Sequence, residues 1–211
     1  MKISVFGATG LVGHPATQEL LASGHEVRVV SRNARRASRF FGPGHDVAEA
    51  DAEDGAGLEQ SLEGCDGVLA SISSPKEDQC LANIQEAAQA RGLKRLIFVS
   101  GCTVLPENAW FALVAGKLAA ERRLEEGDVP WTVLAPGWFF ETLERFVRDG
   151  RVVVIGDNPT PYHFVAARDF ARIVRQAFEN PLAENRRFVI HGPEGITIRT
   201  ALERYCQVRH P

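Results

Sequence analysis

The sequence has few cysteines, and their spacing suits neither a disulfide framework nor a metal site. Four occur among 211 residues (Cys65, Cys80, Cys102 and Cys206), with no Cys-x-x-Cys pair and no clustered histidines. A disulfide-stabilised fold and a structural zinc site are therefore not expected, and we predict no metal site. Free thiols of this kind are typical of a cytoplasmic protein, which is the compartment we expect.

The chain also lacks a long apolar run and an excess of charge of one sign. No stretch reaches the length of a signal peptide or a membrane span, so we expect no membrane partner. Lys and Arg number 24 against 27 Asp and Glu, for a net charge of -3. Such a balance provides no basic field for nucleic acid, so we expect a small-molecule partner bound at a local site.

What the sequence does have is an alternation of apolar runs of strand length with segments of helical periodicity. We predict strands at 3–6, 27–30, 47–50, 68–72, 96–99 and 131–134. Helices are predicted between them at 11–23, 33–40, 57–62, 77–91 and 107–126. Because parallel strands joined by right-handed helical crossovers are covered on both faces, the pattern predicts an α/β fold with a Rossmann-type, doubly wound parallel sheet.

The alternation becomes less regular after Pro136. We predict a helix at 139–147, a strand at 152–155, a proline-rich loop to Pro161, a helix at 166–178, a strand at 188–190 and a final helix from Thr197. No repeat or linker interrupts the chain. We therefore expect a single domain over 1–211, in which residues 137–211 contribute a small C-terminal cap on the substrate side.

A glycine-rich turn stands where the first strand passes to the first helix, in the order Gly-Ala-Thr-Gly-Leu-Val-Gly from residue 7. Glycine permits a tight turn and close approach of a pyrophosphate, while the helix N-terminus offers unpaired N–H groups to the anion. Its position between an apolar strand and a helix makes the pattern specific for a dinucleotide. The residues predicted to bind it are Gly7, Thr9, Gly10, Leu11, Val12 and Gly13.

The residues after the second strand predict which nicotinamide cofactor is preferred. Enzymes that select NAD usually carry a carboxylate there, whereas arginine accommodates the 2′-phosphate of NADP. The strand here ends in Ser31 and Arg32, without a carboxylate. We therefore predict that Arg32 binds a 2′-phosphate, that Ser31 adds a hydroxyl contact, and that NADP(H) is preferred over NAD(H).

At this point the sequence resembles the atypical short-chain dehydrogenases/reductases and, more narrowly, their NAD(P)H-binding, NmrA-like group. Four stretches carry the resemblance: GATGLVG at 7–13, SRN at 31–33, GKLAAERRLEE at 116–126 and APGWFFETL at 135–143. The resemblance implies that residues just beyond three further strands contact the cofactor. The adenine is expected at Asp51 and Ala52, the middle of the cofactor at Ala70, Ser71 and Ile72, and the nicotinamide at Pro136, Gly137 and Trp138.

One departure from the family pattern concerns the catalytic residues. Family members that oxidise or reduce alcohols and ketones carry Tyr-x-x-x-Lys after the fifth strand, where the lysine lowers the phenol pKa. Here Lys117 occupies the lysine position, where it is also expected to reach the nicotinamide ribose, but residue 113 is leucine. The companion serine is expected at Ser100, or its role falls to Thr103 if the alignment shifts by one residue.

We therefore predict an NADPH-dependent oxidoreductase that reduces a conjugated acceptor such as a quinone or a flavin, whose reduction needs less help from an acid. The alternative is a non-catalytic sensor of the NADP(H) redox state, which the absent tyrosine favours. A nucleotide-sugar epimerase or dehydratase is a third, weaker hypothesis, because that chemistry uses the tyrosine. A homodimer is one interpretation of the apolar Trp110 and Phe111, and packing within the chain is the other.

Overall fold

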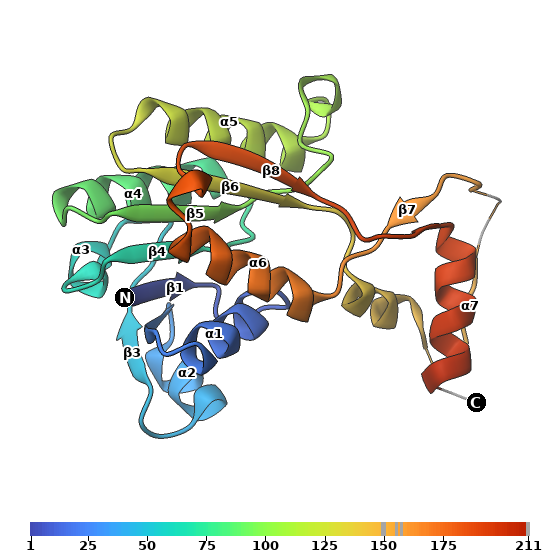
Figure 1. Ribbon diagram of the computed structural model, residues 1–211, viewed down its shortest axis with the longest axis horizontal. Helices are drawn as coiled ribbons and strands as arrows, with labels where there is room; N and C mark the ends of the chain where they lie inside the picture. The colour runs from blue at the N-terminus through green and yellow to red at the C-terminus, as the bar shows by residue number, and fades with distance from the viewer. Residues whose placement is uncertain (149–150, 155, 157, 210–211) are drawn as a thin grey trace.

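Seven parallel strands form one sheet in this computed structural model, which describes residues 1–148, 151–154, 156 and 158–209 (Figure 1). Their order is β3-β2-β1-β4-β5-β6-β8, with every neighbouring pair parallel. The predicted doubly wound Rossmann-type sheet is confirmed. The strands are β1 (Lys2–Phe6), β2 (Glu26–Ser31), β3 (Asp46–Glu49), β4 (Gly67–Ala70), β5 (Arg95–Val99), β6 (Trp131–Pro136) and β8 (Arg186–Ile190).

Helices cover both faces of this sheet (Figure 1). On one face lie α1 (Gly13–Ala22), α2 (Ala34–Phe41) and α6 (Ala167–Glu179), whose apolar residues share a core with β1, β2 and β5. On the other face lie α3 (Leu58–Leu62), α4 (Glu77–Ala90) and α5 (Ala112–Glu126), in a second core with β4 and β6. Because both faces are buried, the central strands read as continuous apolar runs.

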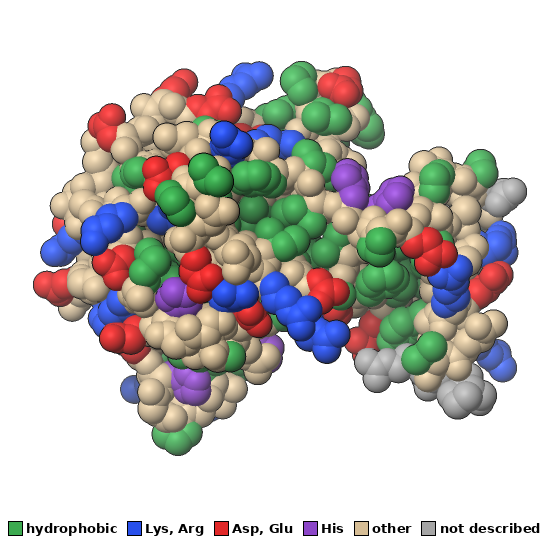
Figure 2. Space-filling view, viewed as in Figure 1, with side chains coloured by type: hydrophobic (Ala, Val, Ile, Leu, Met, Phe, Trp, Pro, Cys, Tyr) green, Lys and Arg blue, Asp and Glu red, His purple; other side chains and the backbone are tan. Residues whose placement is uncertain are grey.

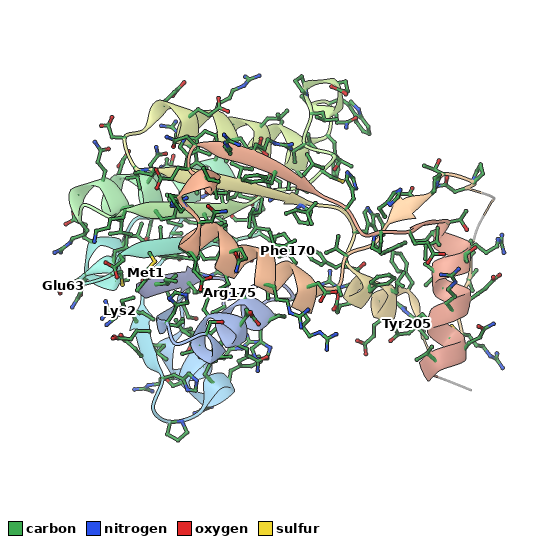
Figure 3. The ribbon with its side chains drawn as sticks, in the orientation of Figure 1. Met1, Lys2, Glu63, Phe170, Arg175 and Tyr205 are labelled. Carbon is green, nitrogen blue, oxygen red and sulfur yellow. The ribbon has the colours of Figure 1, made fainter. Side chains whose placement is uncertain are left out.

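Helix α6 shows how the sequence pattern produces this packing. Its buried residues Phe170, Ala171, Val174, Ala177 and Phe178 follow the spacing of one helical face. Phe170 is fully buried beneath the sheet, where its ring meets that of Phe139 edge to face at 5.4 Å (Figure 3). The face of α6 that is turned to the sheet is therefore held by apolar contact.

A small lobe stands beyond the carboxyl edge of the sheet, and Figure 2 shows a notch between it and the body. It comprises a 3-10 helix (Phe140–Phe146), the two-stranded antiparallel sheet of β7 (Tyr162–His163) and β9 (Gly195–Ile196), and α7 (Ile198–Arg209). It has its own core, centred on Leu143, Phe164 and Leu202. Within the segment 137–211 that was predicted to contribute the cap, α6 and β8 instead complete the main sheet and its cover.

Several local predictions were wrong. The helix predicted at 107–126 begins only at Ala112, because the chain from Pro106 first makes a 3-10 turn (Pro106–Asn108) and the Asn108 amide donates to the carbonyl of Thr103 at 2.9 Å. Residues 140–146 form a 3-10 helix instead of an α-helix. Residues 152–154 form no strand: Val152 and Val154 pack onto the core of the lobe while Val153 is exposed, and position 155 lies outside the described residues.

Candidate cofactor site

The glycine-rich turn connects β1 to α1 and passes very close to the end of β4. Gly7 has φ +74°, and a Cβ built there would lie 1.8 Å from the carbonyl oxygen of Ser71. The N–H of Gly10 closes the turn by donating to the carbonyl of Gly7 at 2.9 Å. A Cβ on Gly13 would lie 2.2 Å from that same Gly7 oxygen. Only glycine therefore fits at the first and last positions of the motif.

The N-terminus of α1 is built to receive an anion. Its N-cap residue Val12 provides no side-chain hydrogen bond, and its first turn carries no acidic residue. The first N–H groups of a helix carry a partial positive charge. Here His14 donates to the carbonyl of Gly10 at 3.0 Å and Pro15 has no N–H, so the donors left for an anion are those of residues 11–13. Leu11 and Val12 pack part of their side chains onto the core, so their backbone is what they offer to a ligand. The turn and the helix end together fit a pyrophosphate.

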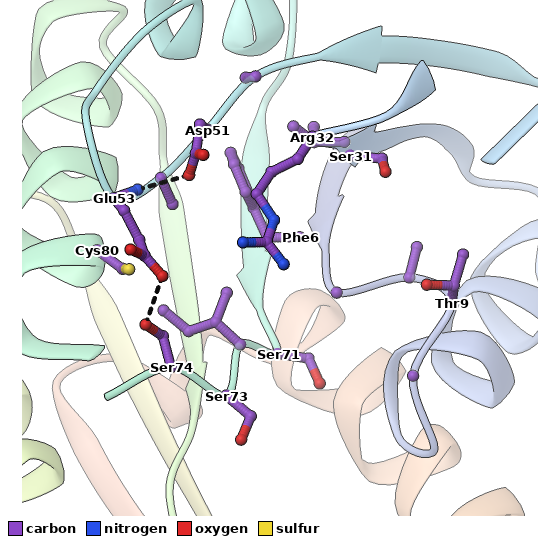
Figure 4. A pocket seen from close by; sticks show the side chains of 17 residues that line it. Phe6, Thr9, Ser31, Arg32, Asp51, Glu53, Ser71, Ser73, Ser74 and Cys80 are labelled. Carbon is purple, nitrogen blue, oxygen red and sulfur yellow. Dashed lines mark hydrogen bonds between the residues drawn. The ribbon is translucent and has the colours of Figure 1, made fainter. Parts of the chain in front are cut away.

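A cavity of about 310 Å³ opens beside this turn, along the ends of β1, β2, β3 and β4 (Figure 4). Nine of the predicted cofactor-binding residues line it: Gly7, Thr9, Gly10, Ser31, Arg32, Asp51, Ala52, Ser71 and Ile72. Sequence reasoning missed other lining residues, among them Glu53, Ser73, Ser74 and Cys80. The sequence carried a signal for Ser73 and Ser74, because they directly follow the predicted residues Ser71 and Ile72 in the segment that leaves β4 at the carboxyl edge of the sheet.

Arg32 provides positive charge on the β2 side of this cavity. Its side chain is exposed and directed over the cavity (Figure 4), and it makes no hydrogen bond or ion pair with any described residue. The nearby carboxylate of Glu49 is engaged elsewhere, because it accepts the N–H of Ala34 at 3.1 Å at the start of α2. Ser31 keeps its hydroxyl within a local turn, bonded to the backbone of Asn33. The guanidinium of Arg32 is thus free to meet an anion.

On the β3 side of the cavity a bonded turn holds two carboxylates. Asp51 accepts the N–H of Glu53 at 2.9 Å through Oδ1, and Glu53 accepts the hydroxyl of Ser74 at 2.7 Å. The Asn83 amide of α4 donates to the carbonyl of Ala52 at 2.8 Å and fixes this turn from behind. Burial raises the pKa of the neighbouring Cys80 thiol, which therefore stays protonated. Hydrogen bonds within the chain therefore connect the residues of this wall.

Outside the glycine turn, five predicted cofactor residues do not line this cavity: Lys117, Ala70, Pro136, Gly137 and Trp138. Ala70 is fully buried within β4 and belongs to the core. Pro136 ends β6, and the N–H of Gly137 donates to the carbonyl of Ile190 at 2.9 Å. Trp138 stacks on Phe146, with ring centroids 6.3 Å apart, in the aromatic contact between body and lobe. The last three therefore lie at the carboxyl edge of β6, and their contact with a nicotinamide stays a prediction.

The two predicted catalytic residues are both engaged by carboxylates. The Nζ of Lys117 donates to Glu77 Oε1 at 2.5 Å and to the carbonyl of Val99 at 3.3 Å. Burial raises the pKa of Glu77, although Lys117 beside it acts in the opposite direction. Ser100 is buried and donates to Glu121, whose other oxygen accepts the Nε of Arg187 at 2.9 Å. Neither Lys117 nor Ser100 lines the cavity of the glycine turn.

No tyrosine replaces the absent catalytic one. Leu113 is about half exposed in the first turn of α5, and both tyrosines belong to the lobe: Tyr162 in β7, and Tyr205 on α7 (Figure 3). Burial also raises the pKa of the Cys102 thiol, which makes that residue a poor nucleophile. His163 of β7 has its Nδ1 2.9 Å from the carbonyl of Gly192 in the lobe.

The described residues contain neither a metal-binding cluster nor a membrane-spanning helix. No group of three or more His, Cys, Asp or Glu side chains among them is arranged to hold a metal ion. Within the same ranges, no helix has the length and apolar character that crossing a membrane requires.

The chain is similar to nicotinamide-dependent enzymes along most of its length. The (4-alkanoyl-5-oxo-2,5-dihydrofuran-3-yl)methyl phosphate reductase of Streptomyces griseus is 29% identical, over 93% of this chain and 70% of its own. The triphenylmethane reductase of Citrobacter sp. complexed with NADP(H) superposes with a TM-score of 0.82 at 20% identity, over 100% of this chain and 76% of the other.

The NADPH-dependent quinone oxidoreductase of Escherichia coli, complexed with NADPH, superposes with a TM-score of 0.79 at 21% identity, over 95% and 72% of the two chains. The model of the NAD(P)H-binding family matches residues 7–181, which include the glycine turn, the cavity and α6. The chain therefore belongs to the NAD(P)H-binding family.

Proposed function

We propose that the chain is an NADPH-dependent reductase that transfers a hydride to a conjugated acceptor such as a quinone or a flavin. The observation that carries the proposal is the unpaired Arg32 guanidinium in a cavity that begins at an anion-binding glycine turn. A free arginine at this position suits the 2′-phosphate that distinguishes NADPH from NADH. The named activities of the Streptomyces, Citrobacter and Escherichia coli proteins, all reductions, support the same class of reaction.

We expect the dinucleotide to enter this cavity in one direction. The pyrophosphate would lie on the N-terminus of α1, the adenine near Asp51 and Ala52, and the 2′-phosphate at Arg32. Gly7 leaves no space for a side chain between the turn and the end of β4, and Gly13 leaves none against the turn, so the backbone itself forms the cradle. The cofactor, when bound, supplies the hydride. The chain contributes binding, orientation and the exclusion of water.

A conjugated acceptor suits the residues at the carboxyl edge. A simple ketone needs a strong general acid. The tyrosine of the family pattern is absent at position 113, and the hydroxyl of the predicted Ser100 is not free, since it donates to Glu121. A quinone or a flavin spreads the incoming charge over its conjugated system and needs less help from an acid. The residues of this edge therefore favour such acceptors over alcohols and ketones.

The alternative is a sensor that binds NADP(H) without turnover. It is favoured by the engagement of both Lys117 and Ser100 in carboxylate contacts, which leaves the cofactor cavity as the better equipped part of the site. The nucleotide-sugar epimerase hypothesis has less support, because its chemistry depends on the tyrosine that Leu113 replaces.

Two assays separate these functions. Titration calorimetry of cofactor-free protein with NADPH, NADP⁺ and NADH measures the affinity of the cofactor site for each nucleotide. Loss of reduced-nicotinamide absorbance with tetramethyl-1,4-benzoquinone or riboflavin as acceptor measures turnover. The methylated quinone has no free ring carbon for attack by the four cysteines. The reductase predicts tight NADPH binding with consumption of NADPH. Binding without consumption indicates the sensor, and no binding refutes both.

The homodimer stays a prediction. Trp110 is 83% exposed and Phe111 is 51% exposed, with their rings 6.0 Å apart before the start of α5. Exposed aromatic side chains in one place are typical of contact surfaces. Analytical ultracentrifugation of the wild-type protein and of Trp110→Ser measures whether these aromatic side chains hold two copies of the chain together.

A further inference from the structure

A second cavity, of about 380 Å³, adjoins the cofactor cavity and has not been assigned a role. It lies between the beginnings of α4 and α5, and Ser73 and Ser74 line both cavities. Its remaining lining is Pro75, Glu77, Ala112, Leu113 and Gly116. Leu113 stands where the resemblance places a catalytic tyrosine, so this cavity lies where an acceptor is expected to meet the cofactor.

The walls of this cavity are apolar apart from its serines and a single carboxyl group. Glu77 is only 2% exposed, and its Oε1 accepts a hydrogen bond from Lys117, whose side chain is 14% exposed. Lys117 in turn lies over the ring of Phe98, 5.1 Å from its centroid, and donates to the carbonyl of Val99. A carboxyl group and a lysine bonded to each other away from water are unusual, and this pair borders a cavity of ligand size.

The surroundings of Glu77 are suited to holding a proton. Lys117 of α5 is the charged group in contact with its carboxyl, and Asp78 and Cys80 are the next titratable groups along its own helix. Burial raises the pKa of Glu77, which favours the protonated form. Once the proton leaves, the ammonium of Lys117 stabilises the carboxylate that remains. A buried acid next to a lysine is thus prepared to give up one proton.

We propose that the second cavity is the acceptor site and that Glu77 is its catalytic acid, with Lys117 as the residue that positions it. The proposal rests on the proposed reductase function. The acceptor gains a hydride with its electron pair from the reduced nicotinamide, which is oxidised. The acceptor oxygen that becomes negative then takes the proton of Glu77, and the O–H bond of the carboxyl breaks. Solvent water returns a proton to Glu77 through the cavity.

The role of the acid can be tested separately from hydride transfer by comparing two classes of acceptor. A quinone needs a hydride and a proton, whereas a triphenylmethane dye cation becomes neutral by taking the hydride alone. In Glu77→Gln the amide keeps the size of the side chain and loses the transferable proton. A general acid contributes about 10²–10⁴-fold to a rate. We therefore expect kcat for tetramethyl-1,4-benzoquinone to fall at least about a hundredfold, with crystal violet reduction changed less than about twofold.

The matched control is Glu86→Gln, an exposed glutamate on the same helix, which should reduce both acceptors at the wild-type rate. Equal losses with both acceptors in Glu77→Gln, or no loss with the quinone, would overturn the assignment of the acid. If the wild-type protein reduces neither acceptor, the proposed reductase function has failed, and that result is distinct from a failure of Glu77.

Binding provides a readout that does not depend on turnover. A Cβ added to Gly116 meets nothing within 4 Å, so Gly116→Leu should fold, fill the cavity and suit the helix better than glycine. We expect calorimetry to show quinone binding weakened at least about tenfold and NADPH binding unchanged. Ala119→Leu, exposed on the same helix, is the control. Unchanged quinone affinity in Gly116→Leu would exclude this cavity as the acceptor site.

Discussion

Arg32→Ala tests the cofactor preference most directly, because the guanidinium lines the cavity and has no partner among the described residues. Its removal should change the free energy of unfolding by less than about 0.5 kcal/mol, as for other exposed substitutions. A hydrogen bond to a charged group contributes about 1.5–3 kcal/mol. Because Arg32 is exposed and its charge is screened by solvent, the lower half of that range applies.

NADPH affinity should therefore fall about 10- to 50-fold, since each 1.4 kcal/mol is tenfold, while NADH affinity stays the same. Calorimetric titration of cofactor-free protein with both nucleotides measures the difference. Arg39→Ala is the control, because Arg39 is exposed in the last turn of α2 and does not line the cavity. Equal weakening of NADPH and NADH, or no weakening of NADPH, would refute the assignment of Arg32 to the 2′-phosphate.

Three further predictions concern stability and its dependence on pH. Gly7→Ala should lower the free energy of unfolding by more than the about 1–2 kcal/mol that left-handed backbone strain costs, because its Cβ would lie 1.8 Å from a carbonyl oxygen. It should also abolish cofactor binding. The control is Gly24→Ala, at φ +83° in open space, which should show only the strain in thermal unfolding. Phe170→Ala should lower the free energy of unfolding by about 3–5 kcal/mol in urea titration, because that ring is fully buried, and a loss below about 1 kcal/mol would contradict the packing described. The N–H of Lys2 donates to Asp66 and lowers the pKa of this carboxyl below 3.8. The unfolded chain therefore binds more protons, and the free energy of unfolding decreases as pH drops through the lowered pKa. Urea titrations below pH 4 should show a smaller decrease for Asp66→Asn than for wild type.

The sheet and the cofactor cavity were predictable for the same physical reason. Each strand of the first half is a short apolar run that ends at a glycine, a serine or an acidic residue, and parallel strands bring those ends to one edge. Residues as distant in sequence as Thr9, Arg32, Asp51 and Ser71 therefore had to meet there. The chain is locally consistent in this region, so pattern and packing agree.

The rest of the site depends on contacts that leave little trace in the sequence. The pairing of Glu77 with Lys117 follows from how α4 packs against α5, and each residue alone looks like an ordinary charge on a helix. Ser100 was expected to face a substrate, yet Glu121 and Arg187 from distant elements draw its hydroxyl inward. Buried polar networks of this kind are determined by tertiary packing, which periodicity does not encode.

The parallel order of the sheet also constrains how the chain is made. Strand β6 pairs with β8, and Thr132 of β6 lies opposite Arg186, which is 54 residues later in the chain. The outer edge of β6 therefore stays unpaired until β8 has been synthesised. At roughly 5–20 residues per second, synthesis leaves that edge open for about 3–10 s. Helix α6, which covers one face of β5 and β6, is also completed within this interval. A nascent chain stalled between these residues would expose an unpaired strand edge beside an uncovered apolar face, which is the state most prone to aggregation.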